Sequence, residues 1–285
     1  MFYDLAANTW GPEEQAAIQR VLASGQLTMG PEVRRFEAQF AAYFGVPYAV
    51  MTNSGSSANL IGVAALCYKR DRPLQRGDEV LVPPISWVTT YTPLQQYGLT
   101  LRFVDVERDS LNLDVDKLEA ALTPRTRAVA AISILGNPAR LDEVRRFADR
   151  HGLYFFEDNC ESMDAELAGR KTGTFGDFGT FSFFFSHHIS TIEGGMLITR
   201  DPELAELARC IRAHGWTRDL PQDTTLFERG SDAFYEGLPL HPAGLQCAAD
   251  GDLGRSRPGA AQEAAGDDRG APGELAIFQA ALRRR

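Results

Sequence analysis

Two segments near the start of the chain carry apolar residues at helical spacing, and each is followed by a glycine. The first runs from Pro12 to Ser24 and stops at Gly25, and the second, Glu32–Phe44, stops at Gly45. Apolar positions at this period form one face of an amphipathic helix, and glycine commonly follows the last helical residue. The pattern therefore predicts one helix in each segment.

Further along, short apolar runs typical of buried strands alternate with longer segments of helical period. The predicted strands are Tyr48–Thr52, Glu79–Val82, Leu101–Val104, Ala128–Ser133, Tyr154–Glu157, Gly179–Phe185 and Met196–Thr199. The predicted helices are Ser57–Tyr68, Trp87–Tyr97, Asp114–Leu122, Leu141–His151 and Pro202 to about Ala213. Such alternation predicts an α/β fold with a mainly parallel sheet covered by helices on both faces. In such sheets ligands bind at the carboxyl ends of the strands.

Charge and composition exclude several classes of protein. The 285 residues carry a formal net charge of −9, so no positive field favours nucleic acid or an anionic membrane. The longest apolar runs are far below the roughly 20 residues that span a bilayer, and the first residues do not resemble a secretory leader, so we expect a cytoplasmic protein. The cysteines are scattered, which argues against a disulfide scaffold, a zinc site or an iron–sulfur cluster; they are Cys67, Cys160, Cys210 and Cys247. We expect no metal site.

The sequence Asn-Ser-Gly-Ser-Ser-Ala at residues 53–58 lies between a predicted strand and a predicted helix. Backbone N–H groups at a helix N-terminus, together with hydroxyls, bind phosphate well. Serine and asparagine are equally favoured as ordinary helix N-caps. Taken alone, the motif leaves both interpretations open.

An acidic pair, Glu157 and Asp158, follows the apolar strand that begins at Tyr154, and Glu161 comes three residues later. A carboxylate buried at the end of a strand needs a partner, and a protonated ring nitrogen would be one. The alternative is that Asp158 is a helix N-cap.

Three consecutive phenylalanines precede Ser186, His187 and His188. An imidazole beside an apolar run can act as acid or base near neutral pH. A metal site is the weaker interpretation, because adjacent residues on a strand face opposite sides.

Six sequence motifs, taken together, resemble those of a known protein family. In order along the chain they are TMGPEVRRFEAQFAAYFG, NSGSSANL, RGDEVLVPPISWVTTY, EDNCES, FGTFSFF and EGGMLITRD. From about Trp10 to Asp219 the chain resembles the DegT-type nucleotide-sugar aminotransferases. The resemblance implies the type I aminotransferase fold and pyridoxal 5'-phosphate (PLP) as cofactor.

One position departs from that family. Five residues after Ser182, where the aminotransferases have the lysine that binds PLP covalently, this chain has His187. Its only lysines are Lys69, Lys117 and Lys171. A histidine here resembles the sugar 3-dehydratase branch of the family, and PISWVTTYTPLQQYG, FEDNCESM, FSHHIST and RAHGWTRDL resemble its members that act on GDP-4-keto-6-deoxyhexoses. The related branch that uses an iron–sulfur cluster has clustered cysteines, which this chain lacks.

The resemblance implies a reaction scheme. Glutamate would convert PLP to pyridoxamine 5'-phosphate (PMP), whose amine would condense with the C4 ketone of the sugar. His187 would remove a proton from the cofactor's methylene carbon and assist departure of the C3 hydroxyl. Hydrolysis would then release ammonia and a 4-keto-3,6-dideoxy sugar, in a pathway of deoxysugar and O-antigen (lipopolysaccharide) biosynthesis.

The resemblance also assigns cofactor contacts by position. Asp158 matches the carboxylate that pairs with the pyridine nitrogen, and Trp87 the aromatic that stacks on the ring. Gly55, Ser56 and Ser182 match the phosphate contacts. The alternative for Trp87 is a core aromatic.

Three further residues are candidates around the cofactor. Glu161 stands where the aminotransferases often have glutamine, and is expected near the ring oxygen. His188 is expected behind the catalytic residues. His214 is a candidate near the site, with capping of the preceding helix as the simpler alternative.

The composition changes near Gly237. From there to Arg285, alanine, glycine, arginine and proline make up 29 of 49 residues, and such a segment buries little apolar area. We expect an N-terminal segment (1–30), a PLP-binding large domain (31–236) and an aberrant low-complexity tail (237–285) in place of the family's small domain. A frameshift near codon 237 is the leading explanation, and it predicts an impaired enzyme.

Two rival functions remain open. One is a DegT-type sugar aminotransferase, which the missing lysine makes chemically awkward. The other is a catalytically dead protein that binds PLP or a nucleotide sugar. The resemblance further implies a homodimer with its sites at the subunit interface.

Overall fold

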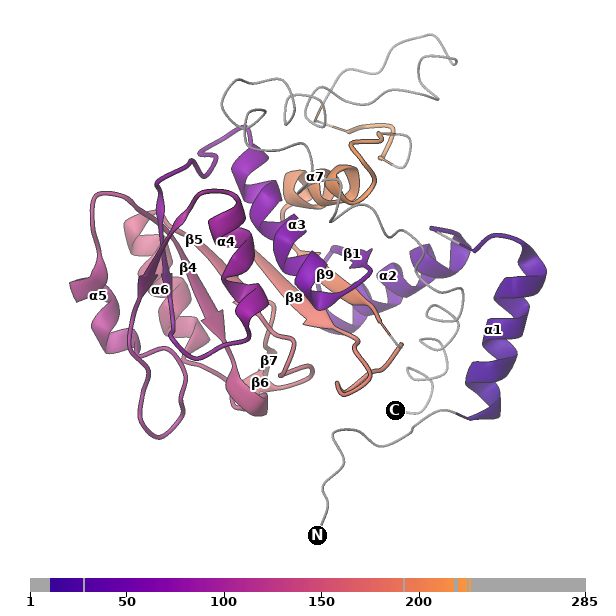
Figure 1. Cartoon of the computed structure of the whole chain (residues 1–285), viewed down its shortest axis with the longest axis horizontal. Coiled ribbons are helices and arrows are strands. Elements are labelled where there is room, and N and C mark those ends of the chain that lie inside the picture. Colours follow the sequence, from indigo (N-terminus) through magenta and orange to yellow (C-terminus); the bar gives the residue numbers. More distant parts are fainter. Residues whose placement is uncertain (1–10, 28, 192, 218–219, 225, 227–285) are drawn as a thin grey trace.

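The computed structural model of the protein describes residues 11–27, 29–191, 193–217, 220–224 and 226. A seven-stranded sheet lies at its centre (Figure 1). The strand order is β1-β9-β8-β5-β4-β2-β3. The strands are β1 (Tyr48–Thr52), β2 (Glu79–Val82), β3 (Thr100–Phe103), β4 (Thr126–Ile132), β5 (Tyr154–Asp158), β8 (Phe178–Ser182) and β9 (Gly195–Thr199). Only β9 runs against its neighbours. The predicted α/β class with a mainly parallel sheet is confirmed.

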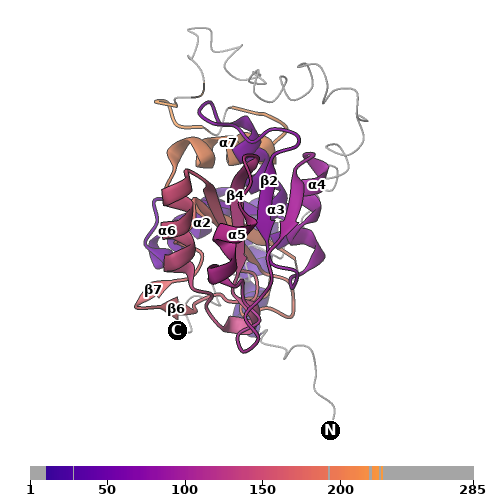
Figure 2. The same ribbon diagram turned by 90° about the vertical axis from the view of Figure 1, so that its left-hand side faces the viewer.

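Helices cover both faces of the sheet (Figure 2). One face packs against α3 (Gly55–Tyr68), α4 (Thr92–Gln96) and α7 (Pro202–Arg212), and the other against α2 (Pro31–Phe44), α5 (Leu118–Ala121) and α6 (Leu141–His151). Side chains alternate along β4: Ala128 and Ala130 face the first layer, and Val129 and Ala131 the second. Because both faces are buried, the central strands are mostly apolar.

The predicted helix ends are confirmed where glycine marks them. Helices α1 (Pro12–Ser24), α2 and α6 are followed by Gly25, Gly45 and Gly152, with φ of 68°, 63° and 61°. Glycine takes this left-handed conformation without steric cost. Helix α1 buries Ala17 and Val21 in a small cluster of its own.

Two predicted helices are broken in the structure. Trp87–Tyr97 is a 3-10 turn, η1 (Val88–Thr90), followed by α4, and Asp114–Leu122 is η2 (Val115–Lys117) followed by α5. Pro93 has no N–H to donate to the carbonyl of Thr89 one turn earlier, which interrupts the first helix. That carbonyl instead accepts a hydrogen bond from Asn59. In the second case the Asp114 side chain caps the short turn.

The segment around β8 also differs from its prediction. The expected strand Gly179–Phe185 ends at Ser182, so the two histidines follow the strand instead of lying on it. A small hairpin, β6 (Glu166–Leu167) and β7 (Arg170–Lys171), precedes β8 and was not predicted. The other strands agree with their predictions to within two residues at each end.

Within the described residues no helix is both long and apolar enough to cross a membrane. The predicted tail at 237–285 and the first residues of the N-terminal segment lie outside the described residues.

Candidate active site

Asp158 ends β5 at the carboxyl edge of the parallel strands and is only 6% exposed. Its Oδ2 accepts hydrogen bonds from the Asn59 amide at 2.8 Å and from the Thr90 hydroxyl at 2.6 Å. Its Oδ1 accepts a longer one, 3.3 Å, from the backbone N–H of Cys160, and the Cys160 thiol also forms a hydrogen bond with the Asp158 side chain. A turn follows β5, so Asp158 is not a helix N-cap and that alternative is wrong.

The start of α3 lies against the end of β8. A Cβ on Gly55 would stand 2.6 Å from the Ser182 Cβ and 2.9 Å from the Cys160 Sγ, so only glycine allows this approach. Ser54 is the N-cap and accepts from the N–H of Ser57, while Ser56 is exposed beside it. The first N–H groups of a helix have no partner within the helix. The helix N-terminus, Ser56 and Ser182 thus form one polar cradle.

Trp87 immediately precedes η1, and its side chain is 71% exposed. The core-aromatic alternative is therefore wrong. The next turn carries Thr90, whose hydroxyl contacts Ser86 at 2.7 Å as well as Asp158. The exposed indole of Trp87 thus directly precedes the short turn that supports the buried Asp158 carboxylate.

His187 lies in a bend after β8, with its backbone N–H donating to the carbonyl of Phe184 at 2.9 Å. Burial lowers the pKa of His187 below its ordinary value, and the neighbouring His188 lowers it further. The negative charges of Glu161 and Asp158 oppose this shift, which places the imidazole within their electrostatic reach. His187 is therefore mostly neutral at pH 7 and able to accept a proton.

His188 is exposed in the same bend. The two histidines do not lie on a strand. The argument that they face opposite sides of a strand, and so rarely share a metal ion, was therefore wrong. Among the described residues no group of histidine, cysteine and carboxylate side chains has the arrangement of a metal site.

Glu161 contacts the loop after β4. Its Oε2 accepts the backbone N–H of Leu135 at 3.0 Å, and the N–H groups on either side, of Ile134 and Gly136, donate to Asn112 and to Ser162. Three consecutive N–H groups are thus held by side chains from other segments. Leu135 adopts a left-handed conformation with φ 51°, and its side chain is 83% exposed. The structure gives Glu161 a role that the sequence did not suggest, that of fixing this loop.

His214 follows α7 with φ 59°, and its ring faces Trp216 at 5.9 Å. The carbonyl of Cys210 at the end of the helix accepts backbone N–H groups of Ala213 and Gly215. The helix end is therefore closed by backbone groups, with His214 in the turn. No described contact links His214 to Asp158.

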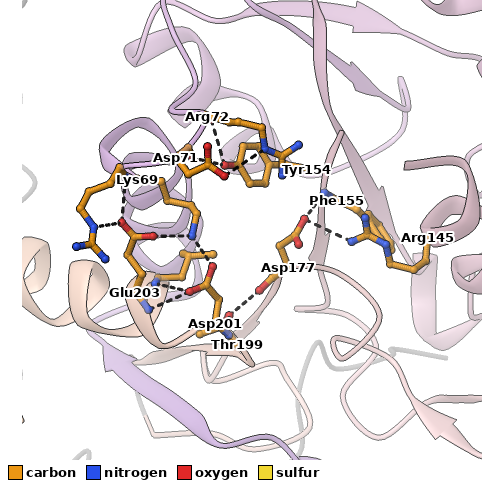
Figure 3. A network of polar contacts seen from close by, with 12 residues as sticks. Lys69, Asp71, Arg72, Arg145, Tyr154, Phe155, Asp177, Thr199, Asp201 and Glu203 are labelled. Carbon is orange, nitrogen blue, oxygen red and sulfur yellow. Dashed lines mark hydrogen bonds and ion pairs between the residues drawn. The ribbon is translucent and has the colours of Figure 1, made fainter. Parts of the chain in front are cut away.

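The three lysines of the chain are held in ion pairs. Figure 3 shows Lys69 between Asp201 and Glu203, at 2.5 Å and 3.0 Å. This network follows the ends of α3 and β9 and so lies at the edge of the sheet opposite Asp158. Lys117 pairs with Asp105 and Asp114, and Lys171 with Asp164 and Glu166.

Three residues of the site were not predicted from the sequence: Asn59, Thr90 and Thr180. Each is buried and joins the hydrogen-bond network of Asp158. The available signal was a polar residue inside an apolar segment, most clearly Asn59 in the helix that reads SSANLIGVAALC. Buried polar groups are almost always hydrogen-bonded, so such a residue implies a partner.

The arrangement suits a flat, positively charged ring that carries an anionic group. Asp158 offers a buried carboxylate whose Oδ1 has only a long backbone hydrogen bond, Trp87 an exposed aromatic face, and the start of α3 a cradle for an anion. His187 adds a neutral imidazole.

The sheet order, the single reversed strand and this carboxylate define an α/β protein of the aminotransferase fold class. A Helicobacter pylori aminotransferase involved in pseudoaminic acid biosynthesis matches with 25% identity and a TM-score of 0.74, over 99% of this chain and 65% of that one. The sequence profile of the DegT/DnrJ/EryC1/StrS aminotransferase family matches residues 8–231, and the chain belongs to this family.

The relatives include two curated GDP-4-keto-6-deoxy-D-mannose 3-dehydratases. The chain is 52% identical over 237 residues to that of Yersinia pseudotuberculosis and 48% identical over 234 residues to that of Escherichia coli O55:H7. These alignments cover 83% and 82% of this chain but 60% of each relative. An E. coli structure of such an enzyme with bound hydrated PLP has 42% identity and a TM-score of 0.85, covering 99% of this chain and 68% of that one.

Proposed function

We propose that this chain carries the catalytic domain of a PLP- and PMP-dependent nucleotide-sugar 3-dehydratase that acts on a GDP-4-keto-6-deoxyhexose with glutamate as amino donor. The observation that carries the proposal is His187. The pKa of this partly buried imidazole is lowered by burial and responds to the charges of Asp158 and Glu161, while every lysine of the chain is committed to an ion pair. Relatives that match over most of this chain are 3-dehydratases of that class.

The residues at the carboxyl edge fit the cofactor. Bound PLP or PMP supplies a conjugated pyridine ring that accepts the electron pair left when an adjacent C–H bond breaks. Asp158 would accept a hydrogen bond from the protonated ring nitrogen, and Trp87 would cover a ring face. The start of α3 and Ser182 would hold the phosphate.

His187 performs the proton transfers in this proposal. Its neutral imidazole accepts the proton from the carbon beside the ring, and the resulting imidazolium gives that proton to the departing C3 hydroxyl, which leaves as water. A lysine at this position would be a nucleophile toward the cofactor, whereas an imidazole is suited to moving protons. The histidine therefore favours elimination over amino transfer.

The test is an assay of the purified chain with PLP, glutamate and GDP-4-keto-6-deoxymannose. A 3-dehydratase forms 2-oxoglutarate, ammonia and the dideoxy keto sugar in equal amounts. An aminotransferase forms 2-oxoglutarate and an aminosugar without ammonia, and a binding protein retains the ligands without turnover. His187→Asn is the matched variant, expected to keep PLP and lose dehydration. Either rival result, obtained both with this chain and with its frame-restored version, refutes the proposal.

A homodimer in the cytoplasm and a large domain at 31–236 belong to the same proposal. The frameshift near codon 237 predicts weaker PLP retention and lower activity than in a frame-restored version. Resequencing the locus tests the cause, and comparing the two proteins tests the consequence. Full activity of the 285-residue chain as a stable dimer would reject this part.

A further inference from the structure

The two carboxylate oxygens of Asp158 are in unequal environments. Oδ2 is held by two short hydrogen bonds, from Asn59 at 2.8 Å and Thr90 at 2.6 Å. Oδ1 has the longer, 3.3 Å contact to the Cys160 N–H, and the Cys160 thiol forms a further hydrogen bond with the Asp158 side chain. Both donors to Oδ2 are neutral, so they stabilise the negative charge without cancelling it.

Thr180 fixes the direction of the Asn59 amide. The Thr180 hydroxyl donates to Asn59 Oδ1 at 2.6 Å, so the amide nitrogen points toward Asp158. Because Thr180 is on β8, next to β5, the orientation is set by the sheet itself. The asparagine is 2% exposed and makes a third bond, at 3.4 Å, to the carbonyl of Thr89.

The same two donors connect the three parts of the site. Asn59 lies one turn along α3 from Gly55, at the start of the phosphate cradle. Thr90 lies in η1, whose N-cap is Trp87. Two hydrogen bonds to a single oxygen therefore connect Asp158 to the two other parts of the site. One leads to the start of α3, which would hold the phosphate, and the other to the turn next to Trp87, which would stack on the ring.

We propose that Asn59 and Thr90 are positioning residues for the cofactor: they fix the orientation of the Asp158 carboxyl group, with Oδ1 turned toward the ring nitrogen. The role rests on the proposed function, since it requires a pyridine cofactor in the site. It follows that removing either donor weakens binding through the ring nitrogen and leaves the rest of the cofactor's contacts in place.

The experiment compares dissociation constants for PLP and for 1-deaza-PLP, in which a C–H group replaces the ring nitrogen. The variants Asn59→Leu and Thr90→Val keep side-chain size and remove the donor. Each is expected to bind PLP roughly 10-fold more weakly, as for a lost hydrogen bond to a charged group, with little change for 1-deaza-PLP. Thr90→Ser keeps the hydroxyl and is expected to restore the preference for PLP.

Thr199→Val is the matched control. Thr199 is 3% exposed and donates its hydroxyl hydrogen bond to the Asp177 carbonyl at the other edge of the sheet (Figure 3). It reports the effect of removing a buried threonine hydroxyl on folding alone, and circular dichroism checks that all variants are folded.

The outcomes separate the two proposals. If the unsubstituted chain binds neither PLP nor its analogue, the proposed function fails and the positioning role fails with it. If it binds PLP in preference to the analogue and both variants retain that preference as Thr199→Val does, the positioning role alone is overturned. Loss of the preference in Asn59→Leu and Thr90→Val, with its return in Thr90→Ser, supports it.

Discussion

Arg212 on α7 donates a 2.6 Å hydrogen bond to Glu37 on α2, and the two side chains are 14% and 10% exposed. Both also bond to Met51, Glu37 to its N–H and Arg212 to its carbonyl. Met51 belongs to β1, the strand at one edge of the sheet. The pair therefore satisfies backbone groups that an open edge strand would otherwise expose.

Replacing Arg212 with methionine is expected to destabilise the protein strongly. The substitution leaves the Glu37 carboxylate buried and without its cation, a change that typically costs about 3–5 kcal/mol. Urea denaturation measures the free energy of unfolding. Arg146→Met is the control, because its pair with Asp142 is exposed and is expected to be worth less than about 1 kcal/mol. Equal losses in both variants would contradict the prediction.

Glu157 makes folding depend on pH. Burial raises the pKa of Glu157 to about 7, although the backbone N–H groups of Gly173, Phe175 and Gly176 lower it. The unfolded carboxyl, with its ordinary value of 4.5, loses its proton first. Between pH 4.5 and about 7 the folded state binds more protons than the unfolded state. The free energy of unfolding therefore falls as pH rises through this range, by about 3 kcal/mol in total.

The variant Glu157→Gln tests this dependence because glutamine does not ionise. The difference in unfolding free energy between the unsubstituted chain and the variant should shrink or reverse as pH rises from 4.5 to 7. Glu166→Gln, whose side chain is half exposed on β6, serves as the control. A difference that is constant with pH would refute the assignment.

The titration of His187 is expected to depend on His188. Burial and the neighbouring imidazole both lower the pKa of His187 from 6.5, so the base form persists below that pH. His188→Gln removes the neighbouring imidazole that lowers the pKa of His187 and should therefore raise that pKa. NMR titration of the imidazole signals measures it without requiring activity. His151→Gln on α6 should leave the value unchanged, and a shift of the same size there would argue against the effect.

Leu135 is a position where glycine should stabilise the protein. A left-handed conformation costs a residue with a side chain roughly 1–2 kcal/mol, and the exposed Leu135 side chain buries little surface in return. Leu135→Gly is expected to gain up to about 1 kcal/mol in unfolding free energy, after the entropy cost of glycine. Leu135→Ala keeps the strained conformation and should gain nothing.

Glu161 should matter to the same loop through its acceptor oxygen. Glu161→Leu leaves the Leu135 N–H without this bond, which is exposed, and should cost about 0.5–1.5 kcal/mol. Glu161→Gln retains an acceptor and should be milder. Thermal denaturation compares them, and equal melting temperatures would show that the hydrogen bond contributes nothing.

PLP is expected to bind without a covalent bond to lysine. Borohydride reduction followed by peptide mapping should find no adduct on Lys69, Lys117 or Lys171 that tracks with activity. His187→Lys is the positive control and should give an adduct at residue 187. An activity-linked adduct on a native lysine would contradict the role given to His187.

Much of the fold could be predicted because its signals are local. Helix α6 agrees with its prediction at both ends, since its apolar stripe is clear and Gly152 ends it. The direction of β9 could not be predicted, because a buried strand shows the same apolar run whichever way it points. The break before α4 is visible in the sequence only as Pro93, and no local pattern shows that the freed Thr89 carbonyl accepts a hydrogen bond from Asn59.

Part of the site could also be predicted from local sequence signals. Asp158 and the cradle at the start of α3 follow strands, so an α/β fold brings them to one edge. The partners of Asp158 come from α3, η1 and β8, and no local pattern states that these three elements meet there. Glu161 likewise contacts a loop 26 residues earlier in the chain.

The reversal of β9 has a consequence for how this enzyme family can diverge. Ser182 pairs with Gly195 on the neighbouring strand, and the N–H of Phe183 bonds to the carbonyl of Gly194 at 2.8 Å, so the segment carrying His187 leaves the sheet and returns to the same place. A residue exchanged within that segment does not alter the register of the strands on either side. Under the proposed function, the reactive group at position 187 can therefore be exchanged for another, with a different reaction as the result, while the sheet is inherited unchanged.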